Sequence, residues 1–307
     1  MTAYVGRFAP TPSGHLHLGS VIAAVGSYLI SRHNRGCYLI RIEDLDTPRC
    51  KSENTAAILD ALDKLALHSD KEILIQSKDT KIYHDKCAEL LHKGYAFYCS
   101  CSRSDLKQRP CTCYKKHLSG SNHHSLRFYH KDLINSSFYD DIKGKVCVRD
   151  PEDNFITLIR ADGIISYNLA CVVDDIRQNV SHIVRGSDLI DVTPVQNALY
   201  KAFGCDAPGY MHLPLAVGAD GLKLSKQNHA ADILSIMSPQ LAIKTALLAL
   251  GQRTDYIDET MICADILHLA LENLDISAIP SDNIVIDDIQ LCLFTKNINL
   301  LNIPDDN

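Results

Sequence analysis

The chain has 307 residues, of which 46% are hydrophobic and 22% charged, as is typical of a globular protein with one large domain or two. No stretch reaches the roughly 20 apolar residues of a membrane span, and the first residues do not resemble a secretory signal. These features exclude a membrane-spanning class and favour a cytoplasmic protein that does not bind membranes. In the cytoplasm, the 12 cysteines are expected to be free thiols or metal ligands rather than disulfides.

The charge is unevenly distributed along the chain. Residues 238–307 contain three basic and eleven acidic residues, whereas residues 1–237 contain 28 basic and 26 acidic ones. A bound polyanion is therefore expected to contact the first part and not the acidic end. The overall charge of −6 does not by itself indicate a nucleic-acid-binding protein.

Strands and helices are predicted to alternate in the first hundred residues. Apolar and β-branched runs predict strands at 4–9 and 37–44, and helical periodicity predicts helices at 17–36, 55–67 and 81–94. This alternation favours an α/β fold in which crossover helices join the strands of a parallel sheet.

The middle of the chain, at about residues 98–144, is irregular and polar, and it is predicted to be an insertion. Alternation is expected to resume with a strand at 145–150, a hairpin turn at 161–163 and a strand at 181–186. A helix over 193–204 should have Pro194 in its first turn and end at Gly204. After residue 238 the pattern is mostly helical.

The segment "GRFAPTPSGHLHLGS" at residues 6–20 joins the first predicted strand to the first helix. Such a glycine-containing turn is a preferred ligand site in α/β sheets, because backbone N–H groups at a helix start favour phosphate. Gly14 and Gly19 would let a ligand approach the backbone closely, and His17 could donate a hydrogen bond to phosphate. The alternative is an ordinary loop with surface histidines.

A second segment, "GLKLSKQN" at residues 221–228, places Lys223 and Lys226 on either side of Ser225. Two ammonium groups on a loop suit the stabilisation of a leaving pyrophosphate. The alternative is the solvated basic tip of a hairpin.

Together these segments resemble class I aminoacyl-tRNA synthetases. "HLGS" is similar to their HIGH motif and "KLSKQ" to their KMSKS loop, while "RFAPTPSGHLHLGS", "RIEDLD", "YNLACVVDD" and "HIVRGSDLID" resemble the glutamyl-tRNA synthetase branch. The resemblance covers residues 4 to 230. It implies a Rossmann-type parallel-sheet catalytic domain over residues 1–237, with a zinc-binding insertion at about 98–144, followed by an acidic, mainly helical region at 238–307.

Only about 75 residues follow the lysine loop, and they are acidic, so an anticodon-binding region is not expected there. A core of this kind resembles the glutamyl-Q tRNA(Asp) synthetase subgroup. That resemblance implies ATP-dependent activation of L-glutamate to glutamyl-adenylate and transfer of the glutamate to queuosine in the anticodon of tRNA(Asp). The alternatives are a truncated ordinary glutamyl-tRNA synthetase that charges the tRNA 3′ end, a non-catalytic RNA-binding paralogue, and a nucleotidyltransferase that uses the same fold on a small substrate.

Glutamate has two carboxylates and one ammonium group, so its pocket needs two cationic donors and an acidic partner. The resemblance places Arg7 and Tyr167 at the side-chain carboxylate, Arg185 at the α-carboxylate and Glu43 at the ammonium group. Backbone atoms of Ala9 and Thr11 would complete the glutamate site. Full-length glutamyl enzymes tend to have Asn at the position of Cys171.

The resemblance also assigns the ATP site. His17 and Lys226 would be the catalytic residues and hold the ATP phosphates. The full set of expected ATP-binding residues is His17, Gly19, Lys223, Ser225 and Lys226. The ATP implies Mg²⁺, for which the sequence shows no dedicated ligand.

The segment "CSCSRSDLKQRPCTC" contains two Cys-x-Cys pairs, at Cys99 and Cys101 and at Cys111 and Cys113. Four thiolates on two short turns suit a tetrahedral zinc ion, and the absence of an obvious open position predicts a structural site. The alternative is four unligated thiols. Cys111 is the expected fourth ligand, with Tyr114 or His117 as the other candidates.

Overall fold

The computed structural model describes residues 3–120, 124–130, 132–149, 154–218, 232–258 and 260–285. The expected ATP-binding residues Lys223, Ser225 and Lys226 lie outside these residues, as do residues 286–307.

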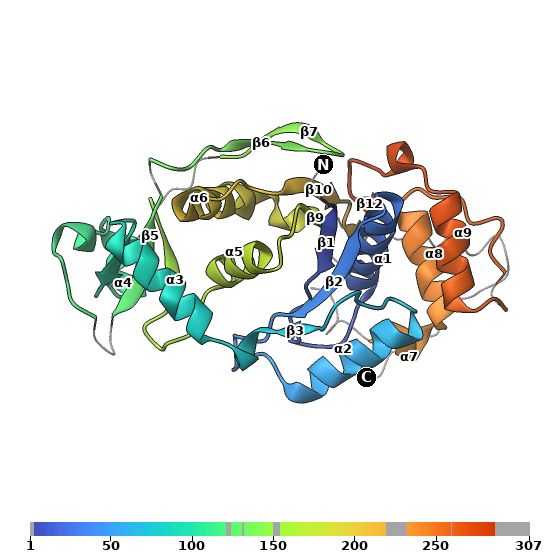
Figure 1. Cartoon of the computed structure of the whole chain (residues 1–307), viewed down its shortest axis with the longest axis horizontal. Coiled ribbons are helices and arrows are strands. Elements are labelled where there is room, and N and C mark those ends of the chain that lie inside the picture. Colours follow the sequence, from blue (N-terminus) through green and yellow to red (C-terminus); the bar gives the residue numbers. More distant parts are fainter. Residues whose placement is uncertain are drawn as a thin grey trace.

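A parallel sheet forms the centre of the molecule (Figure 1). Its strands are β1 (Val5–Phe8), β2 (Cys37–Ile42), β3 (Leu74–Ile75), β9 (His182–Gly186) and β10 (Gly209–Leu213). β1 pairs with β2, β2 with β3 and β9 with β10, always in parallel. The Ser181 N–H donates to the Val5 carbonyl (2.9 Å), so β9 lies beside β1. The resulting order, β3-β2-β1-β9-β10, is that of a Rossmann fold, and it confirms the expected parallel sheet.

Helices connect the strands and cover the sheet (Figure 1). They are α1 (Leu18–His33), α2 (Ser52–Lys64), α3 (Lys81–His92), α5 (Tyr167–Arg177) and α6 (Thr193–Phe203). The predicted limits of α6 are confirmed, since Pro194 lies in its first turn and Gly204 follows its end with a φ of 76°. That left-handed conformation favours glycine.

The insertion consists of antiparallel strands. With the strands that flank the expected 98–144, it contains β4 (Ala96–Cys99), α4 (Arg103–Gln108), β5 (Ser125–Tyr129), β6 (Ser137–Asp140), β7 (Gly144–Cys147) and β8 (Phe155–Ile159). β4, β5 and β8 form one sheet, and β6 and β7 form a hairpin. Alternation of strands and helices resumes as expected, with β8, α5, β9, α6 and β10, but β7 pairs antiparallel with β6 and β8 antiparallel with β5. The turn at 161–163 is confirmed, with Gly163 at a φ of 86°.

The helices after residue 232 share a hydrophobic core with α1. They are α7 (Ile233–Ile236), α8 (Pro239–Ala249) and α9 (Cys263–Glu272), and β12 (Ile284–Val285) pairs with β11 (Ala216–Val217). A Cβ on Gly26 of α1 would lie 2.6 Å from Leu213 Cδ1 and 3.5 Å from Leu250 Cδ1. α1 therefore lies tightly between the sheet and the end of α8, and one hydrophobic core serves both regions.

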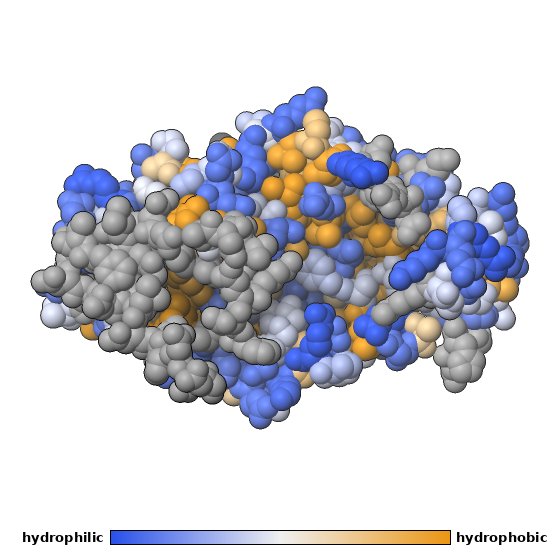
Figure 2. All heavy atoms as spheres, turned by 180° about the vertical axis from the view of Figure 1, so that it is seen from behind, coloured by the Kyte–Doolittle hydropathy of each residue, from blue (hydrophilic) through white to orange (hydrophobic). Residues whose placement is uncertain are grey.

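The surface differs between the middle of the molecule and the end that carries the insertion. Seen from behind, hydrophobic residues gather near the middle, whereas the right-hand end, which carries the insertion, is mostly hydrophilic (Figure 2). Within the described residues, no helix is both long and apolar enough to cross a membrane.

Candidate functional site

A cleft of about 770 Å³ lies at the carboxyl ends of β1, β2, β9 and β10. The sheet order reverses between β1 and β9, and ligands of open α/β sheets bind at such a point. All the described residues that the sequence assigned to glutamate or ATP line the cleft, namely Arg7, Ala9, Thr11, His17, Gly19, Glu43, Tyr167 and Arg185. Tyr167 is 37% exposed and therefore belongs to the cleft wall, not to the core.

His17 precedes the first turn of α1 and caps it. Its Nδ1 accepts a hydrogen bond from the Ser20 N–H (3.3 Å). In the neutral ring this places the proton on Nε2, which can donate to an anion. A Cβ on Gly19 would lie only 3.1 Å from His17 Cε1, so glycine leaves room for the ring. The helix start thus combines the positive end of the helix dipole with an oriented imidazole.

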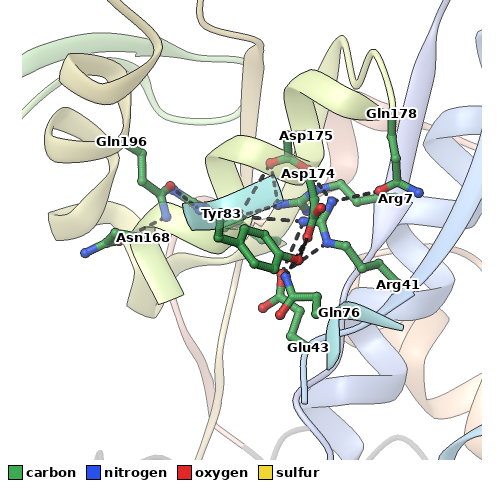
Figure 3. Close-up of polar contacts among 12 residues, drawn as sticks. Arg7, Arg41, Glu43, Gln76, Tyr83, Asn168, Asp174, Asp175, Gln178 and Gln196 are labelled. Carbon is green, nitrogen blue, oxygen red and sulfur yellow. Dashed lines mark hydrogen bonds and ion pairs between the residues drawn. The ribbon is translucent and has the colours of Figure 1, made fainter. Parts of the chain in front are cut away.

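Arg7 is buried and held by Asp175 of α5 (Figure 3). Its Nε donates to Asp175 Oδ1 (3.1 Å), and Arg41 Nη1 donates to the same oxygen (2.8 Å). Burial favours protonation of Asp175, but the charges of Arg41 and Arg7 outweigh it and lower the pKa of the carboxyl to about 2. Among the described residues, Nη1 of Arg7 has no acceptor, so it can donate to a ligand in the cleft.

Glu43 follows β2 and shares Arg41 with Asp175 (Figure 3). Its Oε1 accepts hydrogen bonds from Arg41 Nε (3.3 Å) and Nη2 (3.2 Å). No described residue donates to Oε2. Burial raises the pKa of Glu43, although Arg41 and Arg7 oppose the shift. A cationic group bound at Oε2 would stabilise the ionised carboxylate, so this position suits an ammonium group.

Arg185 is 4% exposed and already makes four hydrogen bonds. Its acceptors are His212 Nε2 (3.1 Å), Gln196 Oε1 (2.8 Å), Thr193 Oγ1 (2.7 Å) and the Leu189 carbonyl (3.3 Å). A guanidinium has five N–H groups, so the described residues leave one of them for a ligand. Arg185 can therefore donate a single N–H to a carboxylate, and not the two-pronged contact that an arginine can make.

From the sequence, neither Arg41 nor Asp175 was assigned a functional role. Two spacings could have revealed them. Arg41 and Glu43 are two residues apart at the end of one strand and so lie on the same side of it. Tyr167, Cys171 and Asp175 are spaced by four residues on α5 and share a helix face. The face that carries the cleft residue Tyr167 therefore also carries the partner of Arg7.

The four predicted metal ligands form one cluster. The Sγ atoms of Cys99, Cys101, Cys111 and Cys113 all lie within 4.8 Å of one another. The Cys99–Cys111 and Cys101–Cys113 Sγ distances are 3.5 and 3.6 Å. In a zinc tetrahedron with Zn–S bonds of about 2.3 Å, sulfurs are about 3.8 Å apart, so the cluster is compatible with zinc.

The alternative ligand Tyr114 points elsewhere. Its ring stacks on that of Tyr129, with centroids 5.5 Å apart. His117 is not part of the group of potential metal ligands found among the described residues.

Solved structures with the same fold include two glutamate-tRNA ligases. The enzyme from Elizabethkingia meningosepticum, solved with its amino acid, aligns with a TM-score of 0.73 at 24% identity; the alignment covers 90% of this chain and 65% of that enzyme. The glutamate-tRNA synthetase from Elizabethkingia anophelis aligns with a TM-score of 0.75 at 23% identity, over 94% of this chain and 69% of that enzyme. At this identity the likeness shows the α/β fold of class I synthetases.

Sequence comparison gives the family. The model of the catalytic domain of class I tRNA synthetases (E and Q) matches residues 4–117 and 111–237. The glutamyl-Q tRNA(Asp) synthetase of Salmonella paratyphi A is 42% identical over 91% of this chain and 94% of its own length. The enzyme of that name from Escherichia coli K12 is 40% identical over 92% of this chain and 93% of its own. The chain therefore belongs to the glutamyl-Q tRNA(Asp) synthetase family of class I tRNA synthetases, and it is a ligase-type enzyme.

Proposed function

We propose that the protein uses ATP to activate L-glutamate as glutamyl-adenylate and then transfers the glutamate to queuosine in the anticodon of tRNA(Asp). The observation that carries the proposal is the charge pattern of one cleft, which combines Arg7, Glu43 and Arg185. Two cations and one anion complement the two carboxylates and the ammonium group of glutamate. The names of the relatives support the tRNA(Asp) assignment.

In this proposal each end of glutamate has its own partner. Nη1 of Arg7 and the hydroxyl of Tyr167 bind the side-chain carboxylate, and Oε2 of Glu43 accepts from the ammonium group. Arg185 binds the α-carboxylate through its remaining N–H, and backbone atoms of Ala9 and Thr11 complete the site. Because Asp175 holds both Arg7 and Arg41, and Arg41 holds Glu43, the pocket is preorganised for a substrate of one length.

Activation joins the α-carboxylate to the α-phosphorus of ATP. A carboxylate oxygen attacks that phosphorus, the bond to the bridging oxygen breaks, and pyrophosphate leaves with the electron pair. His17 donates from Nε2 to the phosphates, with Gly19 at the same helix start, and ATP brings its Mg²⁺. Lys226, with Lys223 and Ser225, is proposed to stabilise the leaving pyrophosphate. A queuosine hydroxyl then attacks the carbonyl carbon, forming an ester and releasing AMP.

Two measurements test this function. Glutamate-dependent exchange of pyrophosphate into ATP should occur without tRNA, since both small molecules are proposed to bind in this cleft. Labelled glutamate should then become bound to tRNA(Asp) that contains queuosine, but not to the same tRNA without it. Glutamate on the 3′ end of tRNA(Glu) would instead support an ordinary glutamyl-tRNA synthetase, and no exchange would support the RNA-binding paralogue.

Replacement of His17 by Asn should separate its role as the N-cap of α1 from its proposed role as a donor to the ATP phosphates. Asn is a good N-cap and can still accept from Ser20 N–H, so stability should change by less than about 0.5 kcal/mol. The lost Nε2 donor should lower kcat of pyrophosphate exchange on the order of 10²-fold. Thermal unfolding and exchange kinetics check this.

His17→Ala, which also lacks the cap, should additionally lose about 1 kcal/mol of stability. His33→Asn, at the far end of the same helix, is the matched control and should leave kcat unchanged. Wild-type kcat in His17→Asn would rule out a catalytic role for the ring.

The proposal includes one structural Zn²⁺ bound by Cys99, Cys101, Cys111 and Cys113. Zinc would link the end of β4 to the loop after α4 in a part of the chain with few apolar contacts. Four protein ligands leave no open position for chemistry at the metal.

Removal of zinc by a chelator should therefore lower the melting temperature and unfold the insertion. Metal analysis of the purified protein should give one zinc per chain, and Cys111→Ser should lose it, because the serine hydroxyl is a much poorer ligand. Cys147→Ser, an exposed cysteine outside the cluster, is the control and should retain zinc. Unchanged melting and full glutamate activation after complete removal of zinc would contradict a structural role.

A further inference from the structure

A buried histidine links the insertion to Arg185 in the wall of the cleft. Arg185 on β9 and His212 on β10 are direct partners in the parallel pairing of the two strands. Arg185 Nε donates to His212 Nε2 (3.1 Å), and the His212 side chain is fully buried. On its other side, His212 Nδ1 lies 2.7 Å from Oδ2 of Asp140, which is also fully buried and belongs to β6 of the insertion hairpin. Asp140, His212 and Arg185 thus form a hydrogen-bonded series that runs from the hairpin to the cleft wall.

These contacts fix the tautomer of His212. Nε2 accepts from a permanently protonated guanidinium, so it carries no proton, and the proton must be on Nδ1, which donates to Asp140. Burial lowers the pKa of His212, although Asp140 opposes the shift, so the ring is neutral at neutral pH. A proton on Nε2 would face the N–H of Arg185 and break the contact.

Asp140 is itself held in place by four N–H groups. Its Oδ1 accepts from the backbone N–H groups of Ile142 (3.0 Å) and Lys143 (2.9 Å) at the tip of the hairpin. Its Oδ2 accepts from the backbone N–H of His212 (2.9 Å) as well as from the ring. Because every bond runs from an N–H to the carboxylate, this position requires the charged Asp form.

Stacking fixes the plane of the imidazole. The ring of His212 stacks on that of Tyr210, with centroids 5.9 Å apart and planes at 13°. Phe138, two residues before Asp140, contacts it from the hairpin at 5.8 Å. The position and the hydrogen-bonding direction of Nε2 are therefore both determined by the surroundings of the ring.

We propose that Asp140 and His212 are positioning residues that orient Arg185 for the α-carboxylate of glutamate. The inference rests on the proposed role of Arg185 in glutamate binding and extends it. Since only one N–H of Arg185 remains for the ligand, a rotation of the guanidinium would remove the contact. The β6–β7 hairpin thereby contributes to the affinity of a pocket that it does not line.

Three replacements of His212 test its two hydrogen bonds one at a time. Glutamate-dependent pyrophosphate exchange is the assay. His212→Gln keeps an acceptor for Arg185, so KM for glutamate should rise less than about 5-fold. His212→Asn keeps only a donor to Asp140, and His212→Phe keeps only ring packing. Both should raise KM for glutamate roughly 10- to 100-fold, because the buried Arg185 Nε–H loses its acceptor. KM for ATP should change less than about 3-fold in all three.

The control is His182→Phe, at the start of the same strand β9, whose ring contacts Tyr4 and has no bond to Arg185. It should keep the wild-type KM for glutamate. Equal KM values for His212→Gln and His212→Phe, or a parallel rise of KM for ATP, would overturn the inference and indicate a purely structural histidine.

Nitrogen NMR of the ¹⁵N-histidine-labelled wild-type protein gives a readout that is independent of turnover. His212 should show a protonated Nδ1 and an unprotonated Nε2 across neutral pH, and Asp140→Asn should change this pattern. A protonated Nε2 in the wild type would overturn the inference.

A wild-type protein without glutamate-dependent exchange would overturn the proposed function and, with it, the role in glutamate binding. Wild-type exchange with unaffected His212→Phe would overturn the inference alone.

Discussion

Replacement of Asp175 by Asn is expected to destabilise the protein by about 3–5 kcal/mol. The carboxylate lies between the guanidinium groups of Arg7 and Arg41, and all three side chains are at most 4% exposed. Breaking a buried ion pair by removal of one partner leaves uncompensated charge, and here two cations would lose their shared anion. Urea unfolding followed by circular dichroism measures the change.

Asp85→Asn is the matched control, because it breaks an ion pair with Lys81 at the surface, where both side chains are more than 60% exposed. That variant should stay within about 0.5 kcal/mol of wild type. An equally small effect of Asp175→Asn would mean that water reaches the two guanidinium groups and that the network does not hold the fold together.

The same carboxylate gives the wild type an acid-dependent loss of stability. The pKa of Asp175 is about 2 in the folded protein and 3.8 in the unfolded chain, so folding favours its ionised form. Its contribution of about 2 kcal/mol is fully present above pH 4 and is lost as the pH falls from about 4 to 2. Asp175→Asn should lack this component of the pH dependence, whereas Asp85→Asn should retain it.

Replacement of Arg7 by Gln should lower kcat/KM for glutamate in pyrophosphate exchange by on the order of 10²- to 10³-fold. In the proposed site Arg7 is the cation that binds the side-chain carboxylate, and loss of one partner of a buried charged pair costs about 2–5 kcal/mol. KM for ATP should remain close to the wild-type value, because Arg7 lies on the glutamate side of the proposed site. Steady-state exchange with each substrate varied in turn checks this.

Arg7→Lys keeps the positive charge but loses the planar fork that reaches both Asp175 and the ligand, so it should recover only part of the activity. Arg49→Gln, which removes a 70% exposed arginine from a surface ion pair, should behave as wild type. Unchanged kcat/KM for glutamate in Arg7→Gln would refute the assignment of Arg7 to the side-chain carboxylate.

The sequence was sufficient to predict the parallel sheet and most of the helices. Strongly periodic segments such as the one that forms α1 determine their own structure, and Pro194 and Gly204 mark the ends of α6 through their backbone preferences. The β6–β7 hairpin could not be predicted in the same way. A short strand such as "KVCVRD" has the same pattern whether its partner is parallel or antiparallel, and only tertiary contacts decide between them.

Part of the site was equally predictable. Arg7, Glu43 and Arg185 lie at or near the ends of strands, so the sheet alone brings them to one edge. Arg41 was not predicted because its partner Asp175 is 134 residues away, and no local pattern links the two. His212 was missed for the same reason, since Asp140 precedes it by 72 residues.

The packing of α8 against α1 has a consequence for the folding of the protein during its synthesis on the ribosome. The helix that begins beside His17 emerges early, but the side chains that cover its outer face, such as Leu247 and Leu250, are among the last of the shared core to be synthesised. Until they emerge, the buried face of α1 stays in contact with water and is open to chaperones. The first crossover unit therefore lacks its cover until the segment that forms α8 has been synthesised.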